Sequence, residues 1–300
     1  MFDGFEERSI TTSSAEIFLL TGGSGPPLLL LHGYPQNHVM WHAVAPVLRA
    51  HFSLVIPDLR GYGDSQGPRV DPEHVNYSKR AMAGDMVEVM STLGYEQFAL
   101  AGHDRGGRVA YRLALDRPDR VIALAVLDII PTIGMWERMD HRSALRSFHW
   151  LFLAQPPPLP ERLIGQDPEF FLRQLVDRWA GRPDVLDSAA VAEYVRHFKK
   201  PSVIEATCED YRAGATVDLD HDRADRDRNR KIRCPTLVLW GRRYLAAKAA
   251  SPLEVWRDWA DDVREVALDC GHFVAEERTD ECAAALLDFF RGVTAIHPSD

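Results

Sequence analysis

The chain lacks any apolar run of about 18 residues, the length that a membrane-spanning helix requires. It also lacks a surplus of basic residues, because 35 Lys and Arg stand against 44 Asp and Glu and give a formal net charge of −9. We therefore expect no nucleic acid and no membrane surface as a partner. Residues 1–7 lack the basic and apolar regions of a signal peptide, so we expect a cytoplasmic protein.

Cysteine is scarce, and the few cysteines form no motif. The chain has four in 300 residues, and their spacing matches neither a disulfide framework nor paired metal ligands. We predict that all four are free thiols. They are Cys208, Cys234, Cys270 and Cys282. We expect neither a metal nor a cofactor. The hydrophobic fraction of 46% is ordinary for a globular chain, and 300 residues suit an α/β enzyme with an inserted segment.

The most informative stretch is Gly-His-Asp-Arg-Gly at residues 102–106. An apolar, strand-like run precedes it at 98–101, and apolar residues with helical spacing follow it at 107–115. A strand, a sharp turn framed by two glycines and a helix form a nucleophile elbow, which usually carries Ser at its centre. Here the central residue is Asp104. A helix cap is the alternative role for such an Asp, but a cap does not require this glycine frame.

The exchange of Ser for Asp changes the reaction class that the elbow predicts. A carboxylate is a poor nucleophile for acyl transfer, yet it can displace a leaving group from a saturated carbon. The displacement produces an ester of the Asp side chain, which water then hydrolyses. We therefore predict that Asp104 is a catalytic nucleophile that forms a covalent ester intermediate.

Apolar runs of strand length recur along the chain and predict a mostly parallel central sheet. They span residues 17–20, 28–31, 54–58, 98–101, 121–127, 236–241 and 264–268. The loop after 28–31 contains Tyr34, and Arg105 follows the nucleophile. The backbone amides of these two residues are the predicted donors of an oxyanion hole.

Two further candidates follow predicted strands. Asp128 comes after 121–127, at the edge where α/β sheets bind ligands, and is the candidate acid that orients a histidine. A surface carboxylate at a strand end is the alternative. No acid occurs in residues 242–246 after the next strand, which favours Asp128. His272 lies in a glycine-containing loop after the last strand and is the candidate base, completing the order nucleophile, acid, histidine.

Residues 132–216 differ in composition from the segments on either side. They are rich in Trp, Phe, Pro and helix-forming stretches and contain no strong strand pattern. We predict a helical cap at 132–216, inserted into a core of residues 1–131 and 217–300. Residues 218–231 are dense in Asp and Arg, which predicts a solvated linker. Arg112 and Arg117 are predicted to be surface residues of the helix after the elbow.

The elbow, the His-Gly-x-Pro loop and the terminal Gly-His-Phe resemble the α/β-hydrolase fold over the whole chain. A finer pattern resembles the fluoroacetate (haloacetate) dehalogenases of that superfamily. It consists of Gly-His-Asp-Arg-Gly-Gly-Arg-Val at 102–109, Leu-Asp-Ile-Ile-Pro-Thr at 127–132, Phe-His-Trp at 148–150 and Cys-Glu-Asp-Tyr-Arg-Ala-Gly at 208–214. The resemblance implies an Asp nucleophile, a second Asp and a His base at the three positions already singled out.

The resemblance also implies a substrate-binding set. Arg105 and Arg108 would bind the substrate carboxylate, which agrees with the ability of guanidinium groups to grip a carboxylate through paired hydrogen bonds. The leaving halide would be held by His149, Trp150 and Tyr211, whose N–H and O–H groups can stabilise developing negative charge. Adjacent helical residues point about 100° apart, so His149 and Trp150 can converge only in a special local geometry. Packing within the cap is their alternative role.

We therefore expect hydrolytic dehalogenation of haloacetates to glycolate and halide, with a small 2-haloacid and water as reactants and a homodimer as the assembly. An epoxide hydrolase is the alternative, because it also uses an Asp nucleophile and Tyr194 and Tyr211 could protonate an epoxide oxygen. Arg105 argues against an epoxide hydrolase, since an epoxide carries no carboxylate. Arg105 also disfavours an alkyl-halide dehalogenase, which typically has Trp at the position after the nucleophile. The third possibility is a small-acid-binding protein on a hydrolase scaffold.

Overall fold

The computed structural model describes residues 1–245 and 251–294. Its centre is an eight-stranded sheet in the order β1-β2-β4-β3-β5-β6-β7-β8. The pairs β1–β2 and β2–β4 are antiparallel, and the other five pairs are parallel. The strands are β1 (Glu6–Thr11), β2 (Glu16–Gly22), β3 (Pro27–Leu31), β4 (Ser53–Pro57), β5 (Phe98–His103), β6 (Val121–Leu127), β7 (Thr236–Gly241) and β8 (Val263–Leu268).

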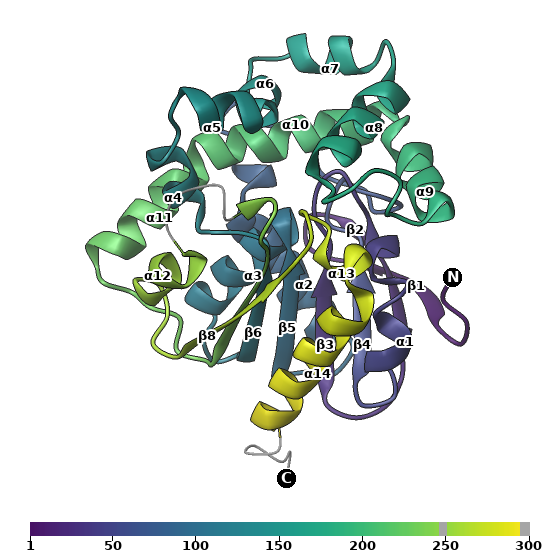
Figure 1. Cartoon of the computed structure of the whole chain (residues 1–300), viewed down its shortest axis with the longest axis vertical. Helices are drawn as coiled ribbons and strands as arrows, with labels where there is room; N and C mark the ends of the chain where they lie inside the picture. The colour runs from purple at the N-terminus through teal and green to yellow at the C-terminus, as the bar shows by residue number, and fades with distance from the viewer. Residues whose placement is uncertain (246–250, 295–300) are drawn as a thin grey trace.

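Helices flank this sheet, and a second group of helices lies over one end of it (Figure 1). The first group comprises η1 (His38–Trp41), α1 (Ala45–Leu48), η2 (Val75–Tyr77), α2 (Lys79–Thr92), α3 (Asp104–Asp116), α12 (Pro252–Arg257), α13 (Val274–Glu277) and α14 (Thr279–Thr294). Between β6 and β7 the chain forms α4 (Thr132–Glu137), α5 (His141–Arg146), α6 (Phe148–Leu153), α7 (Leu159–Ile164), α8 (Pro168–Trp179), α9 (Ser188–Phe198), α10 (Pro201–Ala215) and α11 (Val217–Asp227).

The central strands are buried on both faces, and this burial accounts for their continuous apolar sequences. Every residue of β5 is buried, and so is nearly every residue of β3 and β6, because helices cover both faces of the sheet. The edge strand β1 was missed, since Ile10 is its one buried residue and the segment therefore lacks an apolar run. The predicted α/β-hydrolase architecture, a mostly parallel sheet flanked by helices, is confirmed.

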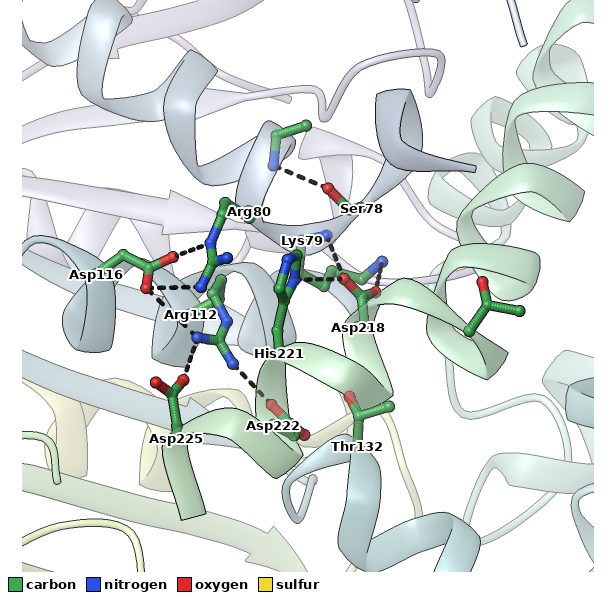
Figure 2. Close-up of polar contacts among 12 residues, drawn as sticks. Ser78, Lys79, Arg80, Arg112, Asp116, Thr132, Asp218, His221, Asp222 and Asp225 are labelled. Atoms are coloured by element: carbon green, nitrogen blue, oxygen red, sulfur yellow. Dashed lines mark hydrogen bonds and ion pairs between the residues drawn. The ribbon is translucent and has the colours of Figure 1, made fainter. Parts of the chain in front are cut away.

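The prediction for residues 218–231 was wrong. Most of this segment is the helix α11, and three of its carboxylates, those of Asp218, Asp222 and Asp225, are buried against α2 and α3 (Figure 2). Asp218 accepts a hydrogen bond from the backbone N–H of Lys79 at 2.8 Å, and Asp222 pairs with Arg112 at 2.8 Å. Asp225 is a further partner of Arg112. The three acids are spaced i, i+4 and i+7, a spacing that places them on one helix face.

The same contacts correct the prediction for Arg112. Its side chain is buried among three carboxylate partners, Asp116, Asp222 and Asp225, instead of lying at the surface. Charge density alone suggested solvent exposure, but opposite charges on facing helices satisfy each other in the interior. Arg117, at the end of α3, is exposed as predicted.

Two compositional predictions can be compared with the structure directly. All four cysteines are free, which confirms the prediction of unpaired thiols. Within residues 1–245 and 251–294, no helix combines the length and the apolar character needed to cross a membrane.

Candidate active site

The predicted elbow forms where β5 ends and α3 begins. Asp104 is the first residue of α3 and has a positive φ of 44°, a conformation that non-glycine residues rarely adopt. Two glycines permit this turn. A Cβ on Gly102 would overlap the carbonyl oxygen of Gly106, and a Cβ on Gly106 would overlap the carbonyl oxygen of His32. The backbone strain therefore serves to present one carboxylate at the top of the sheet.

His272 lies between two carboxylates. Its Nδ1 is 2.6 Å from Oδ2 of Asp128, and its Nε2 is 3.9 Å from Oδ2 of Asp104. The other oxygen of Asp128 accepts a hydrogen bond from the backbone N–H of Gly241 at 2.9 Å. Asp128, His272 and Asp104 are all buried. The structure thus brings together the three residues that were proposed from their positions after three different strands.

The two oxygens of the Asp104 carboxylate have different surroundings. Oδ1 accepts a hydrogen bond from the backbone N–H of Tyr34 at 3.1 Å, whereas Oδ2 is the oxygen nearest to His272. The loop after β3 therefore supplies an amide donor to this carboxylate. The role of the Tyr34 and Arg105 amides as an oxyanion hole stays a prediction.

Electrostatics keep the Asp104 carboxylate ionised. Burial raises its pKa, but the charges of His272, Arg108 and Arg105 outweigh that effect and hold the pKa below its ordinary value. Burial and the neighbouring His272 lower the pKa of His103 to about 3, so His103 is neutral at neutral pH. Its Nε2 lies 2.9 Å from the carbonyl oxygen of His272 and must carry the proton that this contact needs.

A small cavity of about 10 Å³ lies beside Asp104. That space corresponds to about one water molecule, so the site as it stands fits only a very small ligand. Its lining combines the three central residues with aromatic and apolar side chains: Asp104, Arg108, Asp128, Ile129, Met135, His149, Trp150, Trp179, Tyr244, Leu245 and His272.

The two elbow arginines occupy different positions. Arg108 lines the cavity, and its Nη1 donates to the carbonyl oxygen of Ile130 and to the hydroxyl of Thr132, both at 3.1 Å. Arg105 lies outside that lining, and its guanidinium donates to Asp210, with an Nε–Oδ1 distance of 2.9 Å. Within the described part of the chain, Nε of Arg108 and Nη1 of Arg105 are buried donors without a hydrogen-bond partner.

The three residues expected to hold a halide lie against one another. His149 and Trp150 are in the first turn of the six-residue helix α6, and both line the cavity. The ring of Tyr211, from α10, is 5.7 Å from the His149 ring and 5.8 Å from the Trp150 ring. The hydroxyl of Tyr211 is buried and has no hydrogen-bond partner among the described residues. The start of a short helix thus provides the local geometry that lets two adjacent residues face one tyrosine.

Sequence reasoning missed part of the lining. Tyr244 and Leu245 follow β7, and the ring of Tyr244 is 4.6 Å from the ring of His272. Burial and the negative charges of Asp128 and Asp104 raise the pKa of Tyr244. The loop after β7 attracted notice only because it contains no acid. The available signal was its position, since the loops at the carboxyl ends of all central strands face the same crevice.

Metal coordination has no candidate in the described ranges, because no group of three or more His, Cys, Asp or Glu side chains there could hold an ion. What remains is an ionised carboxylate on a strained turn, a histidine oriented by a second carboxylate, and partly unpartnered cationic and phenolic donors. This arrangement suits nucleophilic displacement followed by hydrolysis of an ester.

Comparison with known proteins places the chain in a family. The alpha/beta hydrolase fold family matches residues 26–279, so this chain belongs to that family. A fluoroacetate dehalogenase from Burkholderia sp is 44% identical over 302 residues, which cover 100% of this chain and 99% of the relative. The resemblance drawn from the sequence motifs is therefore confirmed.

Other relatives show how broad this family is. A soluble epoxide hydrolase from Corynebacterium sp. (strain C12) is 34% identical, covering 90% of this chain and 92% of that protein. Among solved structures, a protein from Nostoc sp PCC 7120 described as an alpha/beta hydrolase is 52% identical. It superimposes with a TM-score of 0.94 and covers 97% of this chain and 99% of its own.

Proposed function

We propose that this chain catalyses the hydrolytic dehalogenation of haloacetates, producing glycolate and halide. The observation that carries the proposal is the ionised Asp104 at the elbow, with Nε2 of His272 3.9 Å from its carboxylate and the positive charges of Arg108 and Arg105 acting on it. The 44% identity to a fluoroacetate dehalogenase over the full chain supports it. A site with an ordinary Ser nucleophile would have supported acyl transfer instead.

The first chemical step is a displacement at the α-carbon. Oδ2 of Asp104 attacks that carbon, a new C–O bond forms, and the carbon–halogen bond breaks with its electron pair leaving on the halide. The halide departs toward the N–H and O–H groups of His149, Trp150 and Tyr211. The buried Tyr211 hydroxyl, which lacks a partner in the described chain, supports this role because a buried donor is normally satisfied.

Binding of the carboxylate positions the α-carbon for that attack. Arg108 offers Nε from the cavity wall, and Arg105, whose guanidinium packs against the ring of Tyr211, offers Nη1. Two donors on separate guanidinium groups can hold the two carboxylate oxygens and so fix the substrate in one orientation. The unpartnered state of both buried nitrogens supports this assignment, since each gains a hydrogen bond when the anion binds.

The second step regenerates the carboxylate. Nε2 of His272 accepts a proton from water, and the resulting hydroxide attacks the ester carbonyl carbon of Asp104. Negative charge develops on Oδ1, which already accepts the N–H of Tyr34, and the amide of Arg105 is the proposed second donor. His272 then returns the proton to the departing glycolate oxygen, while Asp128 stabilises the imidazolium through Nδ1.

The surrounding architecture is also part of the proposal. Residues 132–216 form the cap, and residues 1–131 with 217–300 form the core, so that the halide donors of α6 and α10 lie above the nucleophile. Residence in the cytoplasm and assembly as a homodimer stay predictions from the sequence.

Epoxide hydrolysis is the second candidate, because a soluble epoxide hydrolase is 34% identical over most of both chains. It would require two acidic donors near Asp104. The hydroxyl of Tyr194 instead donates to Glu276 at 2.8 Å, so Tyr211 is the one of the two whose hydroxyl has no partner among the described residues. Neither tyrosine is among the residues that line the cavity. These contacts favour the dehalogenase.

The proposal is tested by offering the purified enzyme fluoroacetate, chloroacetate and an aryl epoxide in parallel. Halide release with stoichiometric glycolate from a haloacetate is the expected result. Diol formation from the epoxide without halide release would assign the second candidate. Binding of haloacetate without product would instead indicate a small-acid-binding protein.

A further inference from the structure

The guanidinium of Arg105 is held by a residue from a different part of the chain. Asp210, on α10, accepts from Nε of Arg105 at 2.9 Å and also from Nη2, whose second acceptor is the backbone carbonyl of Asp210 at 2.7 Å. Both side chains are fully buried. Two of the three guanidinium nitrogens are therefore committed to one residue, and Nη1 is the nitrogen left without a partner in the described structure.

Asp210 is itself fixed by other partners. Its Oδ2 accepts from the hydroxyl of Tyr62 at 2.7 Å, and its Oδ1 pairs with Nζ of Lys79 at the start of α2. Lys79 also forms an ion pair with Asp218 on α11, with 3.4 Å between Nζ and Oδ2 (Figure 2). Burial raises the pKa of Asp210, but Arg105 and Lys79 outweigh burial and keep this pKa well below its ordinary value.

The close approach of α10 supports the same arrangement. A Cβ on Gly214, one turn beyond Asp210, would lie 3.0 Å from Nη2 of Arg105. The ring of Tyr211 also packs against it, with its centroid 4.1 Å from the guanidinium carbon. The guanidinium is thus in contact with consecutive turns of α10.

We propose that Asp210 is a positioning residue that orients Arg105 for carboxylate recognition. By taking Nε and Nη2, Asp210 leaves Nη1 as the single donor that a substrate carboxylate can use. Because α10 also carries Tyr211, the same helix sets both the carboxylate donor and a proposed halide donor. The inference rests on the proposed function for its substrate, but the anion-binding role can be measured without turnover.

Two variants test the role. Asp210→Asn removes the charge with little change of shape, and Asp210→Asn/Lys79→Met also removes the cation that would otherwise be left unbalanced in the interior. We expect KM for chloroacetate and the dissociation constant for acetate, measured by calorimetry, to rise by about 10-fold or more in both. The turnover number should fall much less, because a positioning defect at the carboxylate affects mainly binding.

Asp225→Asn is the matched control. Asp225 is also a buried acid paired with arginine, but its partners Arg112 and Arg230 lie outside the site. Asp225→Asn should bind acetate like the unmodified enzyme, and cooperative unfolding of each variant shows that it is folded.

The outcomes separate the two proposals. Unchanged acetate affinity in both Asp210 variants, or an equal loss in Asp225→Asn, would overturn the positioning role even if the enzyme releases halide. Absence of halide release from the unmodified enzyme would overturn the dehalogenase proposal, while the acetate measurements would still decide whether Asp210 orients an anion-binding arginine.

Discussion

Nε2 of His272 lies 3.9 Å from Oδ2 of Asp104, which is beyond hydrogen-bond distance. The proposed base is therefore close to the proposed nucleophile without being hydrogen-bonded to it. An ionised carboxylate needs no base to become nucleophilic, and the lowered pKa of Asp104 keeps it ionised. His272 should consequently be needed for the second step and dispensable for the first.

This division of labour predicts a trapped intermediate. In His272→Asn, displacement should still occur but hydrolysis should be slowed strongly, since general-base catalysis typically contributes about 10²–10⁴-fold. The enzyme mass measured after incubation with chloroacetate should increase by one carboxymethyl group, located on the peptide that contains Asp104. His51→Asn, at an exposed histidine, should retain full turnover and no adduct. An unmodified His272→Asn protein, with no halide released, would argue against an ester that this histidine resolves.

Arg108 should contribute to substrate binding directly. Arg108→Met removes a cavity-lining cation that has an unpartnered Nε, and KM for chloroacetate should rise by about 10- to 100-fold. Arg117→Met is the control, because Arg117 lies at the opposite end of the same helix and is exposed. Steady-state halide release measures both. Equal KM values for Arg108→Met and the unmodified enzyme would remove Arg108 from carboxylate recognition.

The buried pairs of α11 should be important for stability. Arg112→Met leaves Asp222 buried without its cation, while Asp225 keeps Arg230, and the unpaired buried carboxylate should lower the free energy of unfolding by about 3–5 kcal/mol. Arg117→Met should change it by less than about 0.5 kcal/mol, because that side chain is at the surface. Urea unfolding followed by circular dichroism makes the comparison. A negligible effect at Arg112 would contradict the burial of this ion-pair cluster.

Stability should depend on pH through His103. Its pKa is about 3 in the folded protein, against an ordinary value of 6.5. Between these two pKa values the histidine binds a proton in the unfolded chain but not in the folded chain. The stability that neutral His103 contributes is therefore fully present above pH 6.5 and is lost as the pH falls below that value. The slope is about 1.4 kcal/mol per pH unit for one such group.

His103→Gln provides the measurement, because its side-chain amide can still donate to the carbonyl oxygen of His272. Unfolding free energies between pH 5 and 6.5 should fall less steeply with acid in the variant than in the unmodified protein. Identical slopes would show that His103 is not held neutral by its environment.

Much of the architecture could be predicted because the central strands are continuous apolar runs that end in chemically distinctive residues. Asp104, Asp128 and His272 follow three separate strands, and parallel packing brings the ends of those strands together. Their proximity in space therefore followed from local patterns plus one rule of sheet topology.

The parts that could not be predicted depend on contacts between distant segments. Asp210 is recognisable only from its contact with Arg105, since 105 residues separate the two in the sequence. Asp222 is 110 residues from Arg112, and a stretch of alternating charges gives no indication of such a partner. Edge strand β1 was missed for a simpler reason, because exposed strands lack the apolar pattern that identifies buried ones.

The most direct test of the central claim follows the oxygen of water into the enzyme. A single turnover of chloroacetate with excess enzyme in ¹⁸O-labelled water should place one ¹⁸O atom in the side chain of Asp104, detected by peptide mass spectrometry. The glycolate formed should carry unlabelled oxygen at its hydroxyl, because that atom comes from Asp104. Labelled glycolate with an unlabelled Asp104 would mean that water attacks the substrate directly, and the covalent mechanism would be wrong.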